Sequence, residues 1–201
     1  MILNLSSEEE MNKYKSRRSN DIYLFSNVFS EDTCNKLVDY TNKNVKDRLV
    51  VDKSQNVQGY QGSIFMDNPF FKSISSKLID IGKFLARKYH ITFGLYGKYN
   101  HERITIRKIN GPTQLHQDGV VYDTTESTTQ IKVDQVRVLS IIIALNGDYD
   151  GGEIVFPCQN FRTKLKQGEA IAFPPYWTHP HYTEDLKNNT FRYTINTWLT
   201  L

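Results

Sequence analysis

Two short histidine-containing segments carry side chains that could hold a metal ion. His116 and Asp118 are separated by one residue, and His179 and His181 are spaced in the same way. Alternate residues of an extended chain project to the same side, so each pair can meet one ion. Two imidazoles and one carboxylate form a facial set that suits Fe(II) and leaves coordination positions open. Each pair taken alone has a plainer explanation, as a hydrogen-bonded surface histidine or as part of a solvated loop.

The last predicted strand, residues 191–199, carries a candidate anion site. With a period of two, one face of this strand carries Arg192, Thr194, Asn196 and Trp198, and the other carries Phe191, Tyr193, Ile195 and Leu199. A guanidinium can bind a carboxylate through two parallel hydrogen bonds, and a threonine hydroxyl beside it can assist. An arginine on the solvated face of an edge strand would show the same spacing. The tryptophan on this face favours a covered surface instead.

The second half of the chain consists of short β-branched and aromatic runs separated by turn residues. These runs predict strands over residues 102–108, 137–145, 153–156, 170–173 and 191–199. Helices followed by many closely spaced strands are typical of an antiparallel sandwich or barrel with helices on one side. We therefore expect a mainly β fold with flanking helices.

Helices are expected in the first half of the chain. Residues 22–29 predict a short strand, after which Ser30 can cap a helix with acidic residues in its first turn. A second helix is expected over residues 68–88, where a capping asparagine and a proline precede apolar residues at three- and four-residue steps. Residues 1–20 are polar, and we expect them to form an N-terminal segment, or lead-in, ahead of the folded domain. No Pro/Gly linker divides residues 21–201, which we expect to form one domain.

Composition and charge limit the class of protein. The chain has 201 residues and a mass of 23.4 kDa, with 39% hydrophobic and 23% charged residues, an ordinary balance for one globular domain. Its 25 basic and 22 acidic residues leave a net charge of +3, too small and too scattered to favour nucleic acid. The longest apolar run, residues 138–145, is too short to span a bilayer, and the polar N-terminus lacks a signal-peptide core. We expect a cytoplasmic protein without a membrane segment and with two free thiols.

Several motifs occur in a recognisable order along the chain. They are His116-x-Asp118, Leu145-Asn146, Asp150-Gly151-Gly152-Glu153, Phe156-Pro157, Gly168-Glu169-Ala170, Phe173-Pro174, His181, Arg192-Tyr193 and Trp198. In order and spacing they resemble the prolyl 4-hydroxylase-like family of Fe(II)/2-oxoglutarate-dependent dioxygenases, over residues 102–199. The segment from Asn27 into a helix containing Cys34 also resembles the entry helix of that family. The resemblance implies a double-stranded β-helix (jelly-roll) core at about residues 95–201, with the N-terminal helices packed on one sheet.

The resemblance implies a ligand set for the metal. His116, Asp118 and a distal histidine would bind Fe(II). We favour His181 as the distal ligand, because it follows a proline and precedes the arginine of the last strand by eleven residues. His179 is the alternative ligand, and otherwise it would support the site or contact substrate.

The resemblance also implies how a cosubstrate would bind. Arg192 would bind the distal carboxylate of 2-oxoglutarate, with Thr194 assisting. The family often has a tyrosine some nine residues before the first ligand, where this chain has Arg107. Tyr99 or Tyr122 could supply that hydroxyl, or it could be absent. The cofactors implied are Fe(II), with 2-oxoglutarate and dioxygen as cosubstrates, and ascorbate is a further candidate.

The implied reaction is hydroxylation of an unactivated C–H bond with release of succinate and CO2. A prolyl residue in a peptide or protein, or free proline, is the favoured substrate, and loop 119–135 is the candidate cover for it. Another amino acid, a nucleobase or a small metabolite would also suit the wider superfamily, since a fold does not determine a substrate. Outside enzymes, the alternative is a non-catalytic jelly-roll module that binds a metal or carboxylate; the complete ligand set with Arg192 argues against it. A cupin-type metalloenzyme without 2-oxoglutarate is disfavoured by Arg192 and Thr194.

Overall fold

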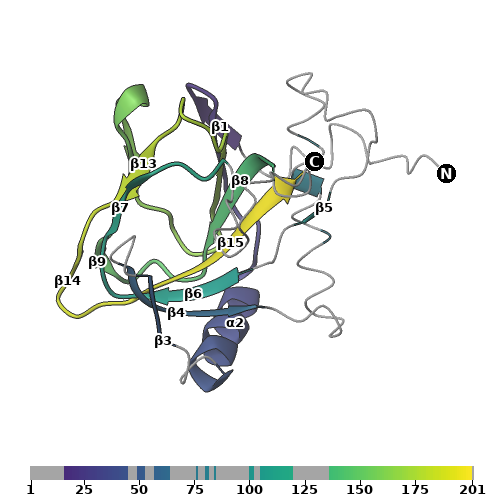
Figure 1. Ribbon diagram of the computed structural model, residues 1–201. Coiled ribbons are helices and arrows are strands. Elements are labelled where there is room, and N and C mark those ends of the chain that lie inside the picture. Colours follow the sequence, from purple (N-terminus) through teal and green to yellow (C-terminus); the bar gives the residue numbers. More distant parts are fainter. Residues whose placement is uncertain are drawn as a thin grey trace, which may run out of the picture.

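Strands dominate the part of the chain that the structure describes. The structure, a computed structural model, describes residues 16–44, 49–52, 57–63, 76, 80–81, 84, 100–101, 105–119 and 136–200. With the labels of Figure 1, the elements are β1 (Ser16–Ser19), β2 (Ile22–Phe25), α2 (Glu31–Asn44), β3 (Leu49–Asp52), β4 (Val57–Ser63), β5 (Asn100–His101), β6 (Thr105–Ile109), β7 (Thr113–His116), β8 (Arg137–Ala144), β9 (Asp150–Gly151), β10 (Ile154–Phe156), η2 (Pro157–Gln159), β11 (Phe161–Thr163), β12 (Ala170–Phe173), β13 (His181–Thr183), β14 (Leu186–Lys187) and β15 (Arg192–Thr200).

The described strands form antiparallel sheets. The large sheet has nine strands in the order β1-β2-β12-β8-β15-β6-β4-β3, with β5 paired to β15. The small sheet has the order β11-β10-β13-β7, and β14 pairs with β9 in a two-stranded sheet. In Figure 1, β7 and β13 lie on one side of the molecule, β8 and β15 on the other, and α2 lies next to β4 and β6. The expected mainly β class with helical cover on one side is confirmed.

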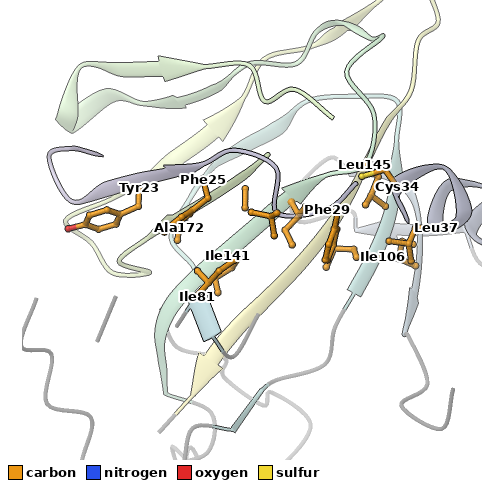
Figure 2. Close-up of a cluster of buried hydrophobic side chains, with 14 of the residues drawn as sticks. Tyr23, Phe25, Phe29, Cys34, Leu37, Ile81, Ile106, Ile141, Leu145 and Ala172 are labelled. Carbon is orange, nitrogen blue, oxygen red and sulfur yellow. The ribbon is translucent and has the colours of Figure 1, made fainter. Parts of the chain in front are cut away.

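Both faces of the large sheet are buried. Along β2, Tyr23 and Phe25 belong to one core cluster, and Ile22 and Leu24 belong to another. We call the first the helix-side cluster (Tyr23, Phe25, Cys34 and the residues packed with them, Figure 2) and the second the small-sheet cluster, which includes side chains of β10. Residues 141–144 of β8 and residues 170–173 of β12 alternate between the two clusters in the same way. Because both sides of these strands are covered, their sequences are continuous apolar runs rather than alternating ones.

Helix α2 begins where the sequence predicts. The backbone N–H of Thr33 donates to Oγ of Ser30 at 3.3 Å, so Ser30 caps the helix and contributes about 1 kcal/mol to its stability. Cys34 and Leu37 lie one turn apart on the buried face, and Figure 2 shows them close to Ile106 and Leu145 of the large-sheet layer. The helix therefore closes the helix-side cluster.

The strand predicted over residues 22–29 is too long. β2 ends at Phe25, and Asn27 adopts a left-handed backbone with φ of 59°, which breaks the extended conformation. The backbone N–H groups of Val28 and Phe29 then both donate to the carbonyl of Gly168. Gly168 has φ of +77°, and a Cβ there would come within 2.3 Å of the Phe29 carbonyl oxygen, so only glycine fits.

The predicted lead-in contributes a strand to the fold. Residues 16–19 form β1, which pairs with β2 in the large sheet. The division into a lead-in at residues 1–20 and one domain at residues 21–201 otherwise stays a prediction. Within the described residues, no helix has the length and apolar character needed to cross a membrane.

Only a few residues of the helix predicted over 68–88 are described. Residues 76, 80, 81 and 84 are helical, Ile81 is buried in the helix-side cluster, and the ring of Phe84 meets Phe25 edge-on at 6.3 Å. The rest of this predicted helix, Tyr99, and residues 120–135 of the predicted cover with Tyr122 lie outside the described residues.

The two thiols should differ sharply in reactivity. Cys34 is fully buried, and burial raises its pKa to about 11, whereas Cys158 is exposed. Because the thiolate is the reactive form, we expect Ellman's reagent at mildly alkaline pH to modify only Cys158 in the folded protein and both thiols in guanidinium.

The matched control is Cys158→Ser, which should give no rapid reaction until it is unfolded. Rapid modification of both thiols in the folded wild type would contradict the burial of Cys34.

Candidate metal centre

Strands β7 and β13 bring the two histidine-containing segments together. They pair in the small sheet with His116 opposite His181, and the centroids of the two imidazole rings lie 4.4 Å apart. Asp118 follows β7 and adds a carboxylate. One ligand atom from each of His116, Asp118 and His181 lies within 4.8 Å of the other two. We call these three residues the triad.

The ring nitrogens of the triad are oriented toward its centre. Nδ1 of His116 lies 2.8 Å from the carbonyl oxygen of Gln114, and Nδ1 of His181 lies 3.2 Å from that of His179. A carbonyl oxygen only accepts hydrogen bonds, so Nδ1 carries the proton in each ring and Nε2 keeps its lone pair. The Nε2 atoms lie 3.4 Å and 3.9 Å from the oxygens of Asp118. Metal-binding histidines are usually oriented by such a bond on the other nitrogen.

The carboxylate of Asp118 is ionised and held from several sides. Its Oδ2 accepts hydrogen bonds from Oγ of Ser140 at 2.7 Å and from Nε1 of Trp198 at 3.0 Å. Burial alone would raise its pKa. The contact with His116 in its protonated form and the hydrogen bond from the Trp198 N–H outweigh burial and hold the pKa of Asp118 well below its usual range.

The backbone around Asp118 is also held in place. Its N–H donates to the carbonyl of Pro175 at 3.0 Å, and its own carbonyl accepts from Nη1 of Arg137 at 3.0 Å. The guanidinium of Arg137 lies 3.8 Å from the centroid of the Trp198 ring, so the same arginine supports the tryptophan that binds the carboxylate.

The two histidines of the triad differ in their affinity for protons. Burial lowers the pKa of His181 to about 4, against the opposing charge of Asp118, so this imidazole is neutral at pH 7. Burial would also lower the pKa of His116, but its hydrogen bond with Asp118 and the carboxylate charge outweigh burial and raise it. Two imidazoles and one ionised carboxylate, without a thiolate, are a donor set that fits Fe(II). A metal ion would compete with a proton only at His116.

Aromatic rings surround the buried histidine. The ring of Phe156 stacks on His181 with centroids 5.4 Å apart and planes 28° apart, and Phe173 meets it edge-on at 4.7 Å. These contacts fix the plane of the imidazole and keep water from its faces.

His179 lies outside the triad. Its Nε2 lies 3.0 Å from the carbonyl oxygen of Asn20, and its Nδ1 lies 2.9 Å from Oγ1 of Thr178. Both ring nitrogens are therefore engaged in contacts that tie the loop before β13 to the turn between β1 and β2. Of the two distal candidates, the structure brings only His181 close to Asp118.

A buried cation lies on the site face of β15. Nη1 of Arg192 donates to the carbonyl of Gly152 at 2.8 Å, and Nη2 donates to Oγ1 of Thr183 at 3.2 Å, while Nε is buried without a partner. No carboxylate among the described residues pairs with Arg192. Burial lowers its pKa to about 10, so the guanidinium stays charged at pH 7. A buried charge without a counter-ion is costly, and an anionic ligand would offset that cost.

The glycines before β10 shape the contact with Arg192. Gly151 and Gly152 have φ of 70° and 69°, and a Cβ on either would come within 2.7 Å of neighbouring atoms. This turn presents the Gly152 carbonyl to the guanidinium. Thr194 is buried on the same face of β15 as Arg192, but its hydroxyl donates to Oδ1 of Asn196 at 2.7 Å.

Sequence reasoning missed three residues of the site. Ser140 and Arg137 reach Asp118 from β8, and Thr183 reaches Arg192 from β13. Only Thr183 had a sequence signal, since it lies two residues after His181 and therefore on the same side of an extended strand.

Comparison with known proteins gives one significant curated relative. No protein-family model matches the chain. A protein of Acanthamoeba polyphaga mimivirus described as "Putative prolyl 4-hydroxylase" is 22% identical over 160 residues, covering 78% of this chain and 61% of that protein. The chain is similar to prolyl 4-hydroxylases. It spans about three fifths of the length of this relative.

Solved prolyl hydroxylases share the fold. The viral collagen prolyl hydroxylase from Paramecium bursaria Chlorella virus-1, in complex with 2-oxoglutarate, matches with a TM-score of 0.67 at 20% identity, covering 90% of this chain and 96% of that chain. A prolyl hydroxylase from Trichoplax adhaerens, in complex with a hypoxia inducible factor peptide fragment, matches with a TM-score of 0.62 at 16% identity, covering 90% and 84%. The predicted double-stranded β-helix (jelly-roll) fold is confirmed, with sheets that are antiparallel and not closed.

Removing the Ser140 hydroxyl should weaken metal binding at the triad. Ser140→Ala deletes a hydrogen bond to the Asp118 carboxylate, and loss of such an outer partner typically costs about 10- to 100-fold in metal affinity. Anaerobic titration calorimetry with Fe(II) or Mn(II) measures the change. The control is Ser30→Ala, which removes the cap of α2 and should lower stability without changing metal affinity. Equal affinity in wild type and Ser140→Ala would contradict this role.

The two distal histidines should respond differently to substitution. His181→Ala should abolish metal binding, because it removes a member of the triad. His179→Ala should keep metal affinity within about threefold, but should lower the melting temperature by a few degrees, because two partly buried hydrogen bonds are lost. Metal titration and thermal unfolding of both variants test this, and the reverse pattern would make His179 the ligand.

Proposed function

We propose that this chain is an Fe(II)- and 2-oxoglutarate-dependent dioxygenase that hydroxylates a prolyl residue in a peptide or protein. One observation carries the proposal: a His-Asp-His triad and a buried arginine without a carboxylate partner among the described residues occur in the same jelly-roll fold. The triad suits a metal ion with open coordination positions. Arg192 suits the remote carboxylate of a dicarboxylic cosubstrate.

In this proposal the triad residues would hold Fe(II), His116 and His181 through Nε2 and Asp118 through a carboxylate oxygen. Ser140 and Trp198 both donate to Oδ2 of Asp118 and so limit the rotation of the carboxylate. Phe156 keeps His181 fixed and dry. When bound, the iron supplies the activation of dioxygen, which the side chains alone cannot provide.

Arg192 holds the cosubstrate. Its guanidinium is already oriented by Gly152 and Thr183, so little conformational entropy is lost when a carboxylate binds. Thr194 adds a hydroxyl beside it on the same face of β15. The hydroxyls of Thr183 and Thr194 can each reorient to donate to a ligand carboxylate, since a hydroxyl both donates and accepts.

In the overall reaction, hydroxylation of the substrate is coupled to oxidative decarboxylation of 2-oxoglutarate. 2-Oxoglutarate, dioxygen and a substrate C–H bond give succinate, carbon dioxide and the corresponding alcohol. One oxygen atom enters succinate and the other enters the substrate, and oxidative decarboxylation of the oxoacid supplies two electrons. The protein needs no nucleophile for this. Its own residues position the reactants and exclude water.

The peptide substrate is supported by the similar proteins. One solved neighbour is named as a collagen prolyl hydroxylase, and another was solved with a peptide fragment. Free proline and other small molecules are the alternatives that a substrate panel would distinguish. A requirement for ascorbate and a cytoplasmic location stay predictions.

Formation of succinate tests the proposed activity. The protein, purified anaerobically and supplied with Fe(II), 2-oxoglutarate and then oxygen, should form succinate, and proline-containing peptides should increase its rate. His116→Ala should abolish turnover. Arg192→Ala should raise KM for 2-oxoglutarate about 100-fold or more, because a buried charge-assisted contact is lost. The KM of Arg192→Lys should lie between those of the wild type and Arg192→Ala.

The matched control is Arg162→Ala, which removes an exposed arginine paired with Glu184 and should leave KM unchanged. Absence of succinate, together with absence of an absorption band that requires both Fe(II) and 2-oxoglutarate, would overturn the dioxygenase proposal.

A further inference from the structure

The loop between β12 and β13 carries an unusually exposed tryptophan. Trp177 is 79% exposed, more than any other large apolar side chain in the described part of the chain. The next most exposed are Leu115 at 59% and Phe191 at 36%. A tryptophan in water forgoes a large hydrophobic gain, so its exposure calls for a physical reason.

The exposure of Trp177 does not come from a loosely attached loop. The carbonyl of Pro175 accepts the Asp118 N–H at 3.0 Å, and the carbonyl of Tyr176 accepts the His179 N–H at 2.8 Å. The carbonyl of Thr178 accepts from the Gln159 side chain at 2.7 Å. The residues on both sides of Trp177 are therefore held by hydrogen bonds while its own side chain remains in solvent.

Trp177 is close in sequence to residues that contact or belong to the triad. Two residues before it, Pro175 binds the backbone of Asp118, and four residues after it comes His181. The ring of Tyr176 lies against Gly119, where an added Cβ would come within 3.0 Å of it. The loop thus covers the turn that follows Asp118, and Trp177 projects from that cover.

The chemistry of this loop points to an uncharged partner. Residues 174–178 are Pro-Pro-Tyr-Trp-Thr, without a charged side chain. An exposed aromatic face in such a setting binds by stacking rather than by ion pairing. Proline-rich segments are one class of ligand that binds to exposed aromatic side chains, because their polyproline II conformation is preformed and their rings are apolar.

We propose that Trp177 is a docking residue for the peptide substrate, stacking its indole on a prolyl ring of a polyproline II segment next to the residue at the metal centre. The proposal rests on the proposed function and deepens it. Trp177 acts on substrate affinity and selectivity, and the metal, the cosubstrate and the chemical step do not depend on it.

Substitution of Trp177 tests the proposal. With a synthetic Pro-Pro-Gly repeat peptide, Trp177→Ala should raise Kd and KM about tenfold or more while kcat changes less than twofold, because an exposed aromatic anchor is removed. Trp177→Phe should recover most of the affinity. The matched control is Leu115→Ala, which removes another exposed apolar side chain close to the triad in sequence and should leave both constants unchanged. An Ala-Ala-Gly repeat peptide controls for proline.

Spectroscopy and cosubstrate turnover separate the two proposals. Peptide binding should shift the tryptophan emission of the wild type to the blue, and this shift should be absent in Trp177→Ala. Uncoupled succinate formation and 2-oxoglutarate affinity should be the same in both proteins.

If Trp177→Ala binds the proline peptide within twofold of wild type, or Leu115→Ala weakens binding as much, the docking role is wrong. If the wild type forms no succinate but loses peptide affinity on substitution of Trp177, the docking role holds and the proposed reaction fails.

Discussion

One ionised carboxylate joins the layers of this fold. Asp118 receives hydrogen bonds from Ser140 of β8 and Trp198 of β15 in the large sheet, and lies beside His116 and His181 of the small sheet. A buried carboxylate must be stabilised by donors or positive charge, or it becomes protonated. The sheets therefore have to face each other closely enough for their side chains to reach one group. The register of β7 against β13 and the direction of Trp198 on β15 meet that requirement.

The second buried charge, the guanidinium of Arg192, is compensated less completely than the Asp118 carboxylate. Asp118 is satisfied by several protein donors, whereas Arg192 has donated to a carbonyl and a hydroxyl and has no carboxylate partner among the described residues. The protein thus carries an anion that is fully supported and a cation that is not. The first charge suits a metal ion, and the second suits an anionic ligand.

Local rules explain how much the sequence could predict. The spacing of His116 and Asp118, the alternation along β15 and the Ser30 cap are all effects within a few residues, and each was readable from the chain. Their partners were not, because Ser140 reaches Asp118, and Thr183 reaches Arg192, through strand register, which a single sequence does not specify. The spacing of Thr183 from His181 indicated only its side of the strand. The choice between His179 and His181 was ambiguous for the same reason. The two histidines lie two residues apart in one extended segment, so either could face Asp118. His179 instead contacts the carbonyl of Asn20, a residue far away in the chain.

The large sheet separates two packing regions that have different duties. The small-sheet cluster includes Phe156 and Phe173, which contact the His181 ring of the triad, so a change of volume there alters the position of an imidazole. The helix-side cluster lies on the opposite face of the sheet. A change of volume around α2 should therefore lower stability without acting directly on that imidazole. The fold thus has one packing region that acts on stability and another that acts on the geometry of the triad as well.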